Sequence, residues 1–106
     1  MAKSKDIGID KTFYFKLLER NGEQEYYYDY LIYAKDHEEA YQMADKYARN
    51  FYSDCDEKEE EYYLFDGGGL ACRIEILHEM SKEDFVNMVV GSQLLTRERI
   101  NSIEED

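Results

Sequence analysis

The chain has 106 residues and is strongly acidic, with 25 Asp and Glu residues against 13 Lys and Arg residues and a formal net charge of -12 at pH 7. A field of this sign repels DNA, RNA and anionic membranes and attracts basic proteins, which argues against direct nucleic-acid or membrane binding. The length fits a single domain, and a hydrophobic share of 43% is enough for a modest folded core.

The first ten residues contain Lys3 and Lys5 but no apolar run, and no segment approaches the roughly 20 apolar residues of a membrane span. Cys55 and Cys72 form neither a C-x-x-C pair nor a disulfide framework. We therefore expect a soluble cytoplasmic protein with two free thiols. Residues 1–10 are expected to be flexible, residues 11–103 to form the domain, and residues 104–106 to fray.

Two strands are predicted over 11–20 and 25–33, because both segments are dense in Phe, Tyr, Leu and Ile. They are joined by Asn21-Gly22-Glu23-Gln24, and Asn-Gly is a strong hairpin signal. Both faces of the second strand carry large side chains, so the two-residue period does not say which face is buried. The two sets are Tyr26, Tyr28, Tyr30 and Ile32 on one face, and Tyr27, Asp29, Leu31 and Tyr33 on the other.

A helix is predicted next. Asp36, followed three residues later by Glu39, is typical of a helix start. Apolar residues then recur at helical spacing, which predicts a stripe that packs against a sheet. The stripe consists of Ala40, Met43, Ala44, Tyr47, Ala48 and Phe51.

An acidic connection from Ser53 to Glu61 follows, with six acidic residues around one lysine. A second hairpin is then predicted from segments 62–65 and 70–77, joined by Asp66-Gly67-Gly68-Gly69. Its expected core face carries Leu70, Cys72, Ile74 and Ile76.

Two more helices are predicted at the C-terminal end. Ser81 and Asp84 resemble a capping box, an apolar stripe follows over 85–89, and Gly91 is expected to stop this helix. A short helix is expected from about Gln93 to Ile103. The order ββα, acidic connection, ββα and tail helix predicts an α+β fold, with an antiparallel sheet of two hairpins and helices packed on one face.

No pattern indicates a metal, a cofactor or a catalytic centre. His37, His78 and the cysteines lack zinc-ligand spacing, and the run that begins at Asp54 departs from a calcium loop at Lys58. The glycines at 67–69 precede a strand, whereas a phosphate-binding loop needs a lysine and a helix after them. No Ser-His-Asp, Cys-His or paired-acid arrangement stands out. We expect no cofactor, no metal and no enzymatic activity.

The tyrosine-rich segment 26–30 could stack nucleic-acid bases only beside a positive groove, and its flanking charges are acidic. Adjacent strand residues point to opposite sides, so at least one of three consecutive tyrosines lies off the core face. Exposed tyrosines beside carboxylates suit a protein interface, because Tyr combines a large rigid ring with a hydroxyl group. Ordinary sheet packing is the alternative explanation.

These observations favour a non-enzymatic acidic binding protein that occupies a basic, nucleic-acid-binding surface of a partner protein, such as a nucleic-acid-handling complex. The candidate binding residues are Asp54, Asp56, Glu57, Glu59, Glu60 and Glu61 in the acidic connection, and Glu23, Glu25, Tyr27, Asp29 and Tyr33 in the first hairpin. The alternative is a small cytoplasmic adaptor or regulatory protein that binds through its Tyr-rich sheet face, with acidity serving only solubility.

In size, acidity and its single α+β domain, the chain resembles the small anti-defence proteins of phages and mobile elements, including anti-CRISPR and anti-restriction proteins that mimic nucleic acid. The acidic run of the connection and the acidic residues of the first hairpin carry this resemblance. It is a likeness of class, carried by no motif. It implies an inhibitor that acts in the cytoplasm of a bacterial host cell if a phage encodes it.

Overall fold

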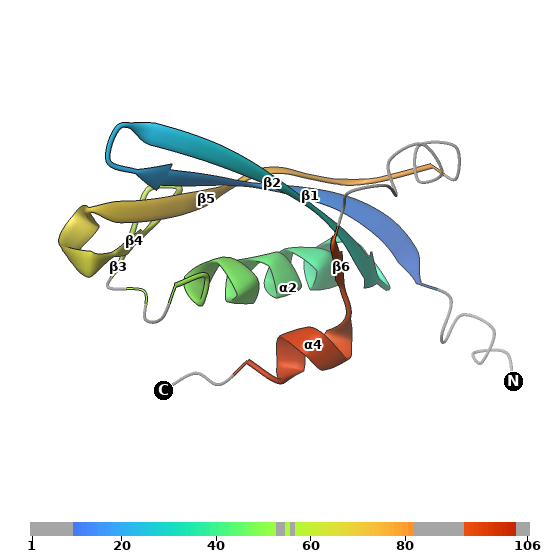
Figure 1. Cartoon of the computed structure of the whole chain (residues 1–106). Helices are drawn as coiled ribbons and strands as arrows, with labels where there is room; N and C mark the ends of the chain where they lie inside the picture. Colours follow the sequence, from blue (N-terminus) through green and yellow to red (C-terminus); the bar gives the residue numbers. More distant parts are fainter. Residues whose placement is uncertain (1–9, 53–54, 56, 82–92, 104–106) are drawn as a thin grey trace, which may run out of the picture.

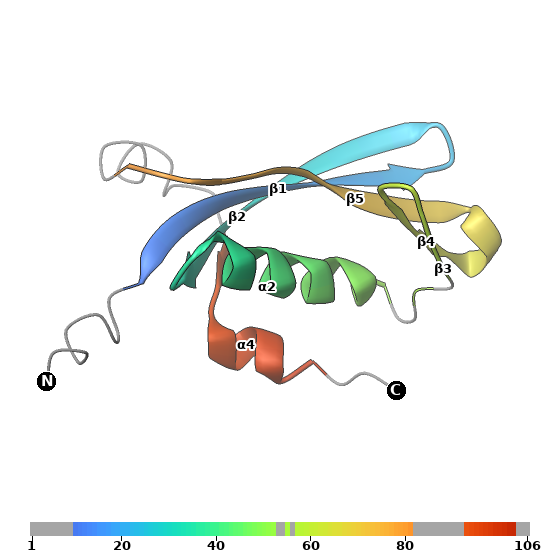
Figure 2. The same cartoon turned by 180° about the vertical axis from the view of Figure 1, so that it is seen from behind.

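The computed structural model of the chain describes residues 10–52, 55, 57–81 and 93–103. Within this part, a six-stranded sheet has the order β3-β4-β5-β1-β2-β6 (Figure 1). Helix α2 lies against one face of the sheet, and helix α4 lies against α2 on the same side (Figures 1 and 2). We call the opposite side the open face, because no helix of the described residues lies on it. The predicted α+β class is confirmed, and the two helices of the described residues lie on one side of the sheet.

The first hairpin consists of β1 (Lys11–Asn21) and β2 (Gln24–Ala34), which pair over their whole lengths. The predicted strands are confirmed, each extended by one or two residues. At the turn, Gly22 has a φ of 66° whereas Glu23 does not have a positive φ. A positive φ at the first central position alone is the type II′ pattern, which favours glycine there.

One face of this hairpin supplies most of the core beneath α2. It contributes Phe13, Phe15, Leu17, Tyr30, Ile32 and Ala34, all buried. Tyr28 packs partly buried against the same cluster. The face of β2 with Tyr26, Tyr28 and Tyr30 is therefore the helix side. The face with Tyr27, Asp29 and Tyr33 is the open face.

Helix α2 (His37–Arg49) begins where the sequence indicates. Asp36 caps it, and its Oδ1 accepts the Glu39 N–H at 2.9 Å. Glu39 does not complete a capping box with Asp36, because its Oε1 accepts the N–H of Lys35 instead. The predicted stripe packs against the sheet as expected: Ala40, Met43, Ala44 and Ala48 are buried, and Tyr47 and Phe51 are partly buried against the same core.

The acidic connection contains a strand that the sequence analysis missed. β3 (Glu57–Glu59) pairs antiparallel with β4 (Tyr62–Phe65), so it forms the outer edge of the sheet. Glu60, with a φ of 58°, lies in the tight turn between them. The expectation of a plain connection was wrong here because a Glu-Lys-Glu segment has low strand propensity, and tertiary pairing overrides it.

The second predicted hairpin is confirmed. β4 and β5 (Leu70–Glu79) pair antiparallel and are joined by the short helix η1 (Asp66–Gly68). β5 also pairs antiparallel with β1, which places the two hairpins in one sheet.

The predicted core face of β5 is wrong at one residue. Leu70, Cys72 and Ile74 pack against the core under α2, but Ile76 packs against a separate cluster of Tyr14, Leu31 and Met80, and Leu77 takes its place. The cause is a register shift: Lys16 lies opposite Ile76 and Leu17 opposite Ile74, so Glu75 is an extra residue. Such a bulge reverses the alternation of faces beyond it.

The predicted helix over 93–103 is wrong in its first half. Gln93–Leu95 form β6, which pairs parallel with β2, so the sheet is mixed rather than purely antiparallel. Thr96 then caps α4 (Arg97–Asn101) by accepting the N–H of Arg99 at 3.1 Å. Leu95 is fully buried, and this burial favours the strand over a helix that would begin at Gln93.

Some predicted features lie outside the described residues. These are the flexible start before Asp10, the helix predicted between Ser81 and Gly91, and the fraying of 104–106. No helix in the described ranges combines the length and apolarity needed to cross a bilayer.

Candidate protein-binding surface

Exposed carboxylates from two distant parts of the sequence meet at one end of the sheet. Asn21, at the first hairpin turn, is the register partner of both Gln24 and Leu70, and Leu70 is the partner of Phe65. The turn of the first hairpin, the turn at η1 and strand β3 therefore share one end of the molecule (Figure 1). We call this the acidic end. Its exposed carboxylates are those of Glu23, Glu25, Glu57, Glu59, Glu60, Glu61 and Asp66.

Strand β3 presents its carboxylates on the open face. Glu57 lies opposite Leu64 and Glu59 opposite Tyr62, whereas Lys58 lies opposite the buried Tyr63 on the helix side. Residues two apart along a strand are separated by about 6.7 Å. This spacing is within the Debye length of roughly 8 Å at physiological salt, so the fields of Glu57 and Glu59 add.

Lys58, the single cation of β3, is used within the molecule. Its Nζ lies 3.9 Å from Asp45 Oδ1, donates to the Tyr41 hydroxyl at 3.4 Å and lies 4.7 Å from the centre of the Tyr63 ring. The Tyr63 hydroxyl also donates to Asp45, at 2.5 Å. Burial, followed by this bond to Asp45, raises the pKa of Tyr63 well above its usual range. Lys58 therefore anchors the edge strand to α2.

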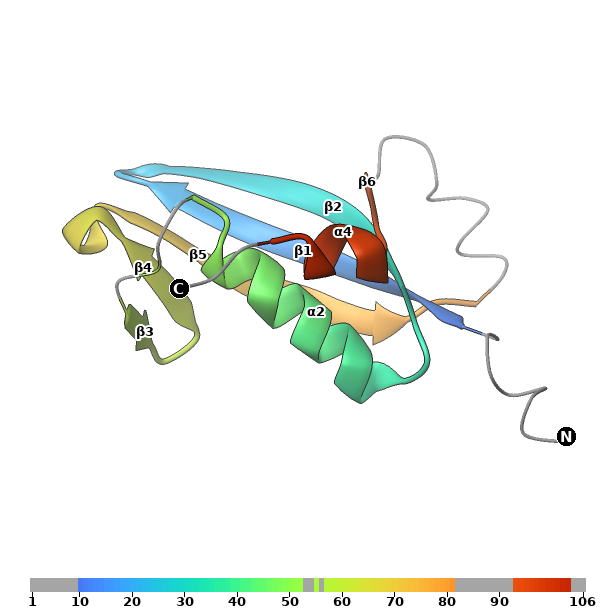
Figure 3. The ribbon, with the colours of Figure 1, turned by 90° about the horizontal axis from the view of Figure 1, so that it is seen from below.

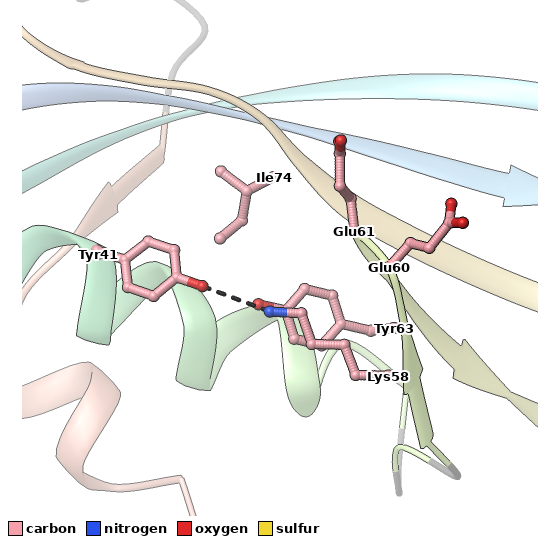
Figure 4. Close-up of a pocket in the computed structure, with 6 residues that line it drawn as sticks. All are labelled: Tyr41, Lys58, Glu60, Glu61, Tyr63 and Ile74. Atoms are coloured by element: carbon pink, nitrogen blue, oxygen red, sulfur yellow. Dashed lines mark hydrogen bonds between the residues drawn. The ribbon is translucent and has the colours of Figure 1, made fainter.

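A cavity of about 210 Å³ lies beside this anchor, between α2 and the β3–β4 turn (Figure 4). Its lining includes Tyr41, Lys58, Tyr63 and Ile74. Figure 4 shows the carboxylates of Glu60 and Glu61 pointing away from the Lys58 ammonium. The cavity is smaller than the roughly 300–1,000 Å³ of ordinary small-molecule sites.

Two cations on the open face, at or near the acidic end, are also partnered internally. Arg20 binds Glu25 at 2.7 Å, and Arg73 binds Glu75 at 2.8 Å. Both guanidinium groups lie about 5 Å from the Tyr62 ring centre, at 5.1 and 5.2 Å. Arg73 also approaches Glu61 at 3.5 Å. By contrast, no cation within the described ranges forms an ion pair with Glu23, Glu57, Glu59 or Glu60.

A second group of carboxylates lies at the other end of α2, where it is neutralised. Arg97 of α4 bonds to both Glu39 oxygens at 2.6 and 2.9 Å, and to both Asp10 oxygens at 2.7 and 3.2 Å. The bonds from Arg97, reinforced by the N–H of Lys35, hold the pKa of Glu39 at about 2. This arrangement ties α4 and the start of β1 to the beginning of α2.

The structure separates the predicted binding residues into groups. It brings Glu23 and Glu25 to the same end as Glu57, Glu59, Glu60 and Glu61, whereas Asp54 and Asp56 lie outside the described residues. Tyr27 and Asp29 lie farther along β2 on the open face, where Asp29 accepts the Tyr14 hydroxyl at 2.5 Å. Tyr33 pairs with Thr12 near the far end of β2. Six residues of strand put Tyr33 about 20 Å from Tyr27.

Two features escaped the sequence analysis. Asp66 was not among the predicted binding residues, but the structure places it at the acidic end, at the start of η1. Glu19 is only 8% exposed and accepts the hydroxyls of Tyr28, at 2.5 Å, and of Tyr52. The bond to Glu19, together with burial, raises the pKa of Tyr28 to about 12. Nothing in the local sequence distinguishes this buried carboxylate from the exposed ones, because its partners are 9 and 33 residues away.

Comparison with known proteins gave no match to a family model, to a curated protein or to a solved structure. In the described part of the chain, no three His, Cys, Asp or Glu side chains gather as a metal site would require. Cys55 and Cys72 are free thiols.

Proposed function

We propose that the protein is a non-enzymatic acidic binding protein whose acidic end occupies a basic, nucleic-acid-binding surface of a partner protein, as in nucleic-acid mimics of the anti-CRISPR type. The observation that carries this proposal is the convergence of exposed carboxylates at the acidic end. Four of them, Glu23, Glu57, Glu59 and Glu60, form no ion pair with a cation of the described residues. Lys58, Arg20 and Arg73 are bound to groups of the protein itself. The negative charge of the remaining carboxylates is therefore not neutralised within the described residues and is available to a partner.

A rigid scaffold adds to this argument. Glu57 and Glu59 are fixed on a paired strand, and Glu60 and Glu61 are in the tight turn that follows. A disordered acidic tail would lose conformational entropy when it binds, whereas carboxylates on a folded sheet have already lost most of it. Against a basic groove, each carboxylate replaces a phosphate contact of the nucleic acid.

The test is a capture experiment with a functional readout. The immobilised protein is exposed to a bacterial lysate, bound proteins are eluted in salt steps, and each eluted protein is assayed for nucleic-acid binding with and without the protein. We expect a basic partner that elutes at moderate salt and loses its nucleic acid when the protein is added. A partner that binds nucleic acid equally well in its presence would overturn the proposal.

A second candidate is an adaptor that binds through tyrosines, and the exposure of Tyr26 (44%) and Tyr27 (53%) on β2 favours it. The two candidates differ in salt dependence. Binding through carboxylates weakens steeply as salt screens the charges, whereas binding through aromatic rings changes little.

A further inference from the structure

The outer edge of β2 is only partly covered. β2 is 11 residues long, but β6 pairs with it only at Tyr30, Leu31 and Ile32. Along Gln24–Asp29, no strand of the described residues pairs on the side away from β1, and Figure 3 shows β2 extending well past β6. An uncovered strand edge presents backbone donors and acceptors that another extended chain can bind.

The hairpin register identifies which backbone groups face outward. In a hairpin with a two-residue turn, the closing pair, here Asn21 and Gln24, is hydrogen-bonded, and bonding to the partner strand recurs at every second residue. The N–H and C=O groups of Glu25, Tyr27 and Asp29 therefore point away from β1. The next residue of this series is Leu31, which lies opposite Leu94 of β6. β6 thus occupies one part of an edge whose remainder is open.

The side chains along this edge favour a cationic occupant. Glu25 and Asp29 flank the exposed Tyr27 on the open face. The segment Gln24–Asp29 contains no cation, and its cationic neighbours on β1 are Arg20, opposite Glu25, and Lys16, opposite Asp29. Lys16 from β1 lies 5.2 Å from the centre of the Tyr27 ring, so this ring already accepts an ammonium group. Glu25 bonds to Arg20, and Asp29 accepts one hydroxyl. A carboxylate has about four acceptor sites, so both can accept more donors.

We propose that the edge of β2 from Glu25 to Asp29 binds an extended, lysine- or arginine-rich segment of a partner protein as an added strand. Main-chain hydrogen bonds to Glu25, Tyr27 and Asp29 hold the segment, and its cationic side chains lie beside the two carboxylates. This inference rests on the proposed function, because it assigns the segment to the same basic partner.

A second copy of the chain fits this edge poorly. Antiparallel pairing of two β2 strands centred on Tyr27 would place Glu25 of one copy opposite Asp29 of the other. Like charges directly opposite each other destabilise a strand pair. Each copy also carries a net charge of -12, which disfavours association at long range.

Amide hydrogen exchange, observed by NMR, tests the site with a short synthetic peptide that alternates lysine and threonine. In the free protein, the amides of Tyr27 and Asp29 should exchange faster than those of Tyr26 and Tyr28, which bond to β1. The peptide should slow the exchange of Tyr27 and Asp29. Protection that appears elsewhere on the sheet, with these two amides unchanged, would overturn the inference.

Substitution of Tyr27 separates the backbone from the ring. Tyr27→Pro removes an N–H that β1 does not use, and we expect about tenfold weaker peptide binding, the loss of roughly one hydrogen bond. Tyr27→Thr keeps the N–H and should retain most of the affinity. If Tyr27→Pro unfolds the hairpin, the parent protein is used instead, and the peptide is N-methylated at alternate residues to remove its own backbone donors. Equal binding of methylated and unmethylated peptides would contradict strand addition.

A pair of charge-matched variants tests the location. Glu25→Gln with Asp29→Asn should weaken peptide binding more than Glu57→Gln with Glu59→Gln, although both remove two charges. Equal weakening would mean general charge attraction and would overturn the site. Sedimentation gives the remaining control: a dimer abolished by Tyr27→Pro would assign the edge to a second copy instead.

The outcomes for the two proposals are distinguishable. If a captured basic partner is lost with the Glu57, Glu59, Glu60 and Glu61 substitutions but keeps its affinity for Tyr27→Pro, the proposed function holds and the strand-addition site is wrong. If the lysine peptide protects Tyr27 and Asp29 but no captured protein loses its nucleic acid, the site holds and the proposed function is wrong.

Discussion

The carboxylates at the two ends of α2 have opposite relations to the rest of the protein. At the beginning of the helix, Glu39 and Asp10 share the guanidinium group of Arg97, so their charge is neutralised within the fold. At the acidic end, Glu57, Glu59 and Glu60 are exposed and have no ion-pair partner among the described residues. The difference shows that net charge alone does not assign a role to a carboxylate. Its partners within the fold decide whether it stabilises the protein or remains available for binding.

The largest loss of stability is expected when a carboxylate is placed in the core without a partner. Ala44 is fully buried under the sheet. We expect Ala44→Asp to lower the free energy of unfolding by about 3 kcal/mol or more, because the new charge has neither water nor a cation. Thermal or urea unfolding measures the effect. Gln42→Asp, at an exposed position of the same helix, is the control and should change stability little; equal effects at both positions would contradict the packing of α2.

Glu19 is a buried carboxylate held by hydroxyl groups rather than by a cation. Replacing Glu19 with Gln puts an amide where Tyr28 and Tyr52 donate, so one donor loses its partner and stability should fall by about 1–2 kcal/mol. The tyrosine titration offers a second readout. The pKa of Tyr28, about 12 in the parent, should return toward 10 in the variant, as followed by absorbance of the tyrosinate. Glu23→Gln is the control and should leave the tyrosine titration unchanged. An unchanged pKa of Tyr28 in Glu19→Gln would show that Tyr28 does not bond to Glu19.

The stability contributed by the pairing of Arg97 with Glu39 should depend on pH. An ordinary glutamate titrates near pH 4.5, but Glu39 in the folded protein keeps its charge to about pH 2. The stability from this pairing is therefore fully present above about pH 4.5 and is lost as the pH falls toward 2. Arg97→Gln should cost about 1 kcal/mol at pH 7, since solvent screens this partly exposed group.

The difference in stability between the parent and Arg97→Gln should shrink between pH 4.5 and pH 2. Urea unfolding at several pH values measures it. A difference that stays constant down to pH 2 would show that Arg97 does not stabilise the charged form of Glu39.

The smallest expected effect on stability is at the acidic end. Replacing Glu57, Glu59, Glu60 and Glu61 with Gln should change the free energy of unfolding by no more than about 0.5 kcal/mol, and the change should be neutral or stabilising because exposed like charges repel. Thermal unfolding at low salt tests this. A large loss of stability would mean that these carboxylates have structural partners beyond the contact between Glu61 and Arg73.

The sequence was sufficient for features that depend on local chemistry. The Asp36 cap, the stripe around Ala44 and the first hairpin with Gly22 were all predicted, since helical spacing and turn residues are local signals. Features that depend on distant pairing were not. β6 pairs with β2, which is far away in sequence. β3 pairs with the adjacent β4, but its Lys58 is held by Asp45 and Tyr41 of α2. The bulge at Glu75 appears only when β5 is aligned with β1.

The candidate surface shows the same division. The acidic residues were evident from composition, but their convergence requires the register of Asn21 with Leu70. The internal use of Lys58 requires α2 to lie beside β3, with Asp45 and Tyr41 in reach. The spacing of residues in the sequence shows neither the register nor the contacts of Lys58. It therefore identified the charged residues but not which of them remain available for binding a partner.

The most direct measurement is the affinity of a captured basic partner across a salt titration, for the parent and for the variant with Gln at positions 57, 59, 60 and 61. We expect the parent to lose affinity steeply as salt rises. The variant should bind more weakly at low salt and with a shallower salt dependence, because fewer carboxylates replace phosphate contacts. Equal affinity of the two proteins at every salt concentration, together with loss of binding in Tyr27 or Tyr33 variants, would contradict the account and favour an aromatic adaptor.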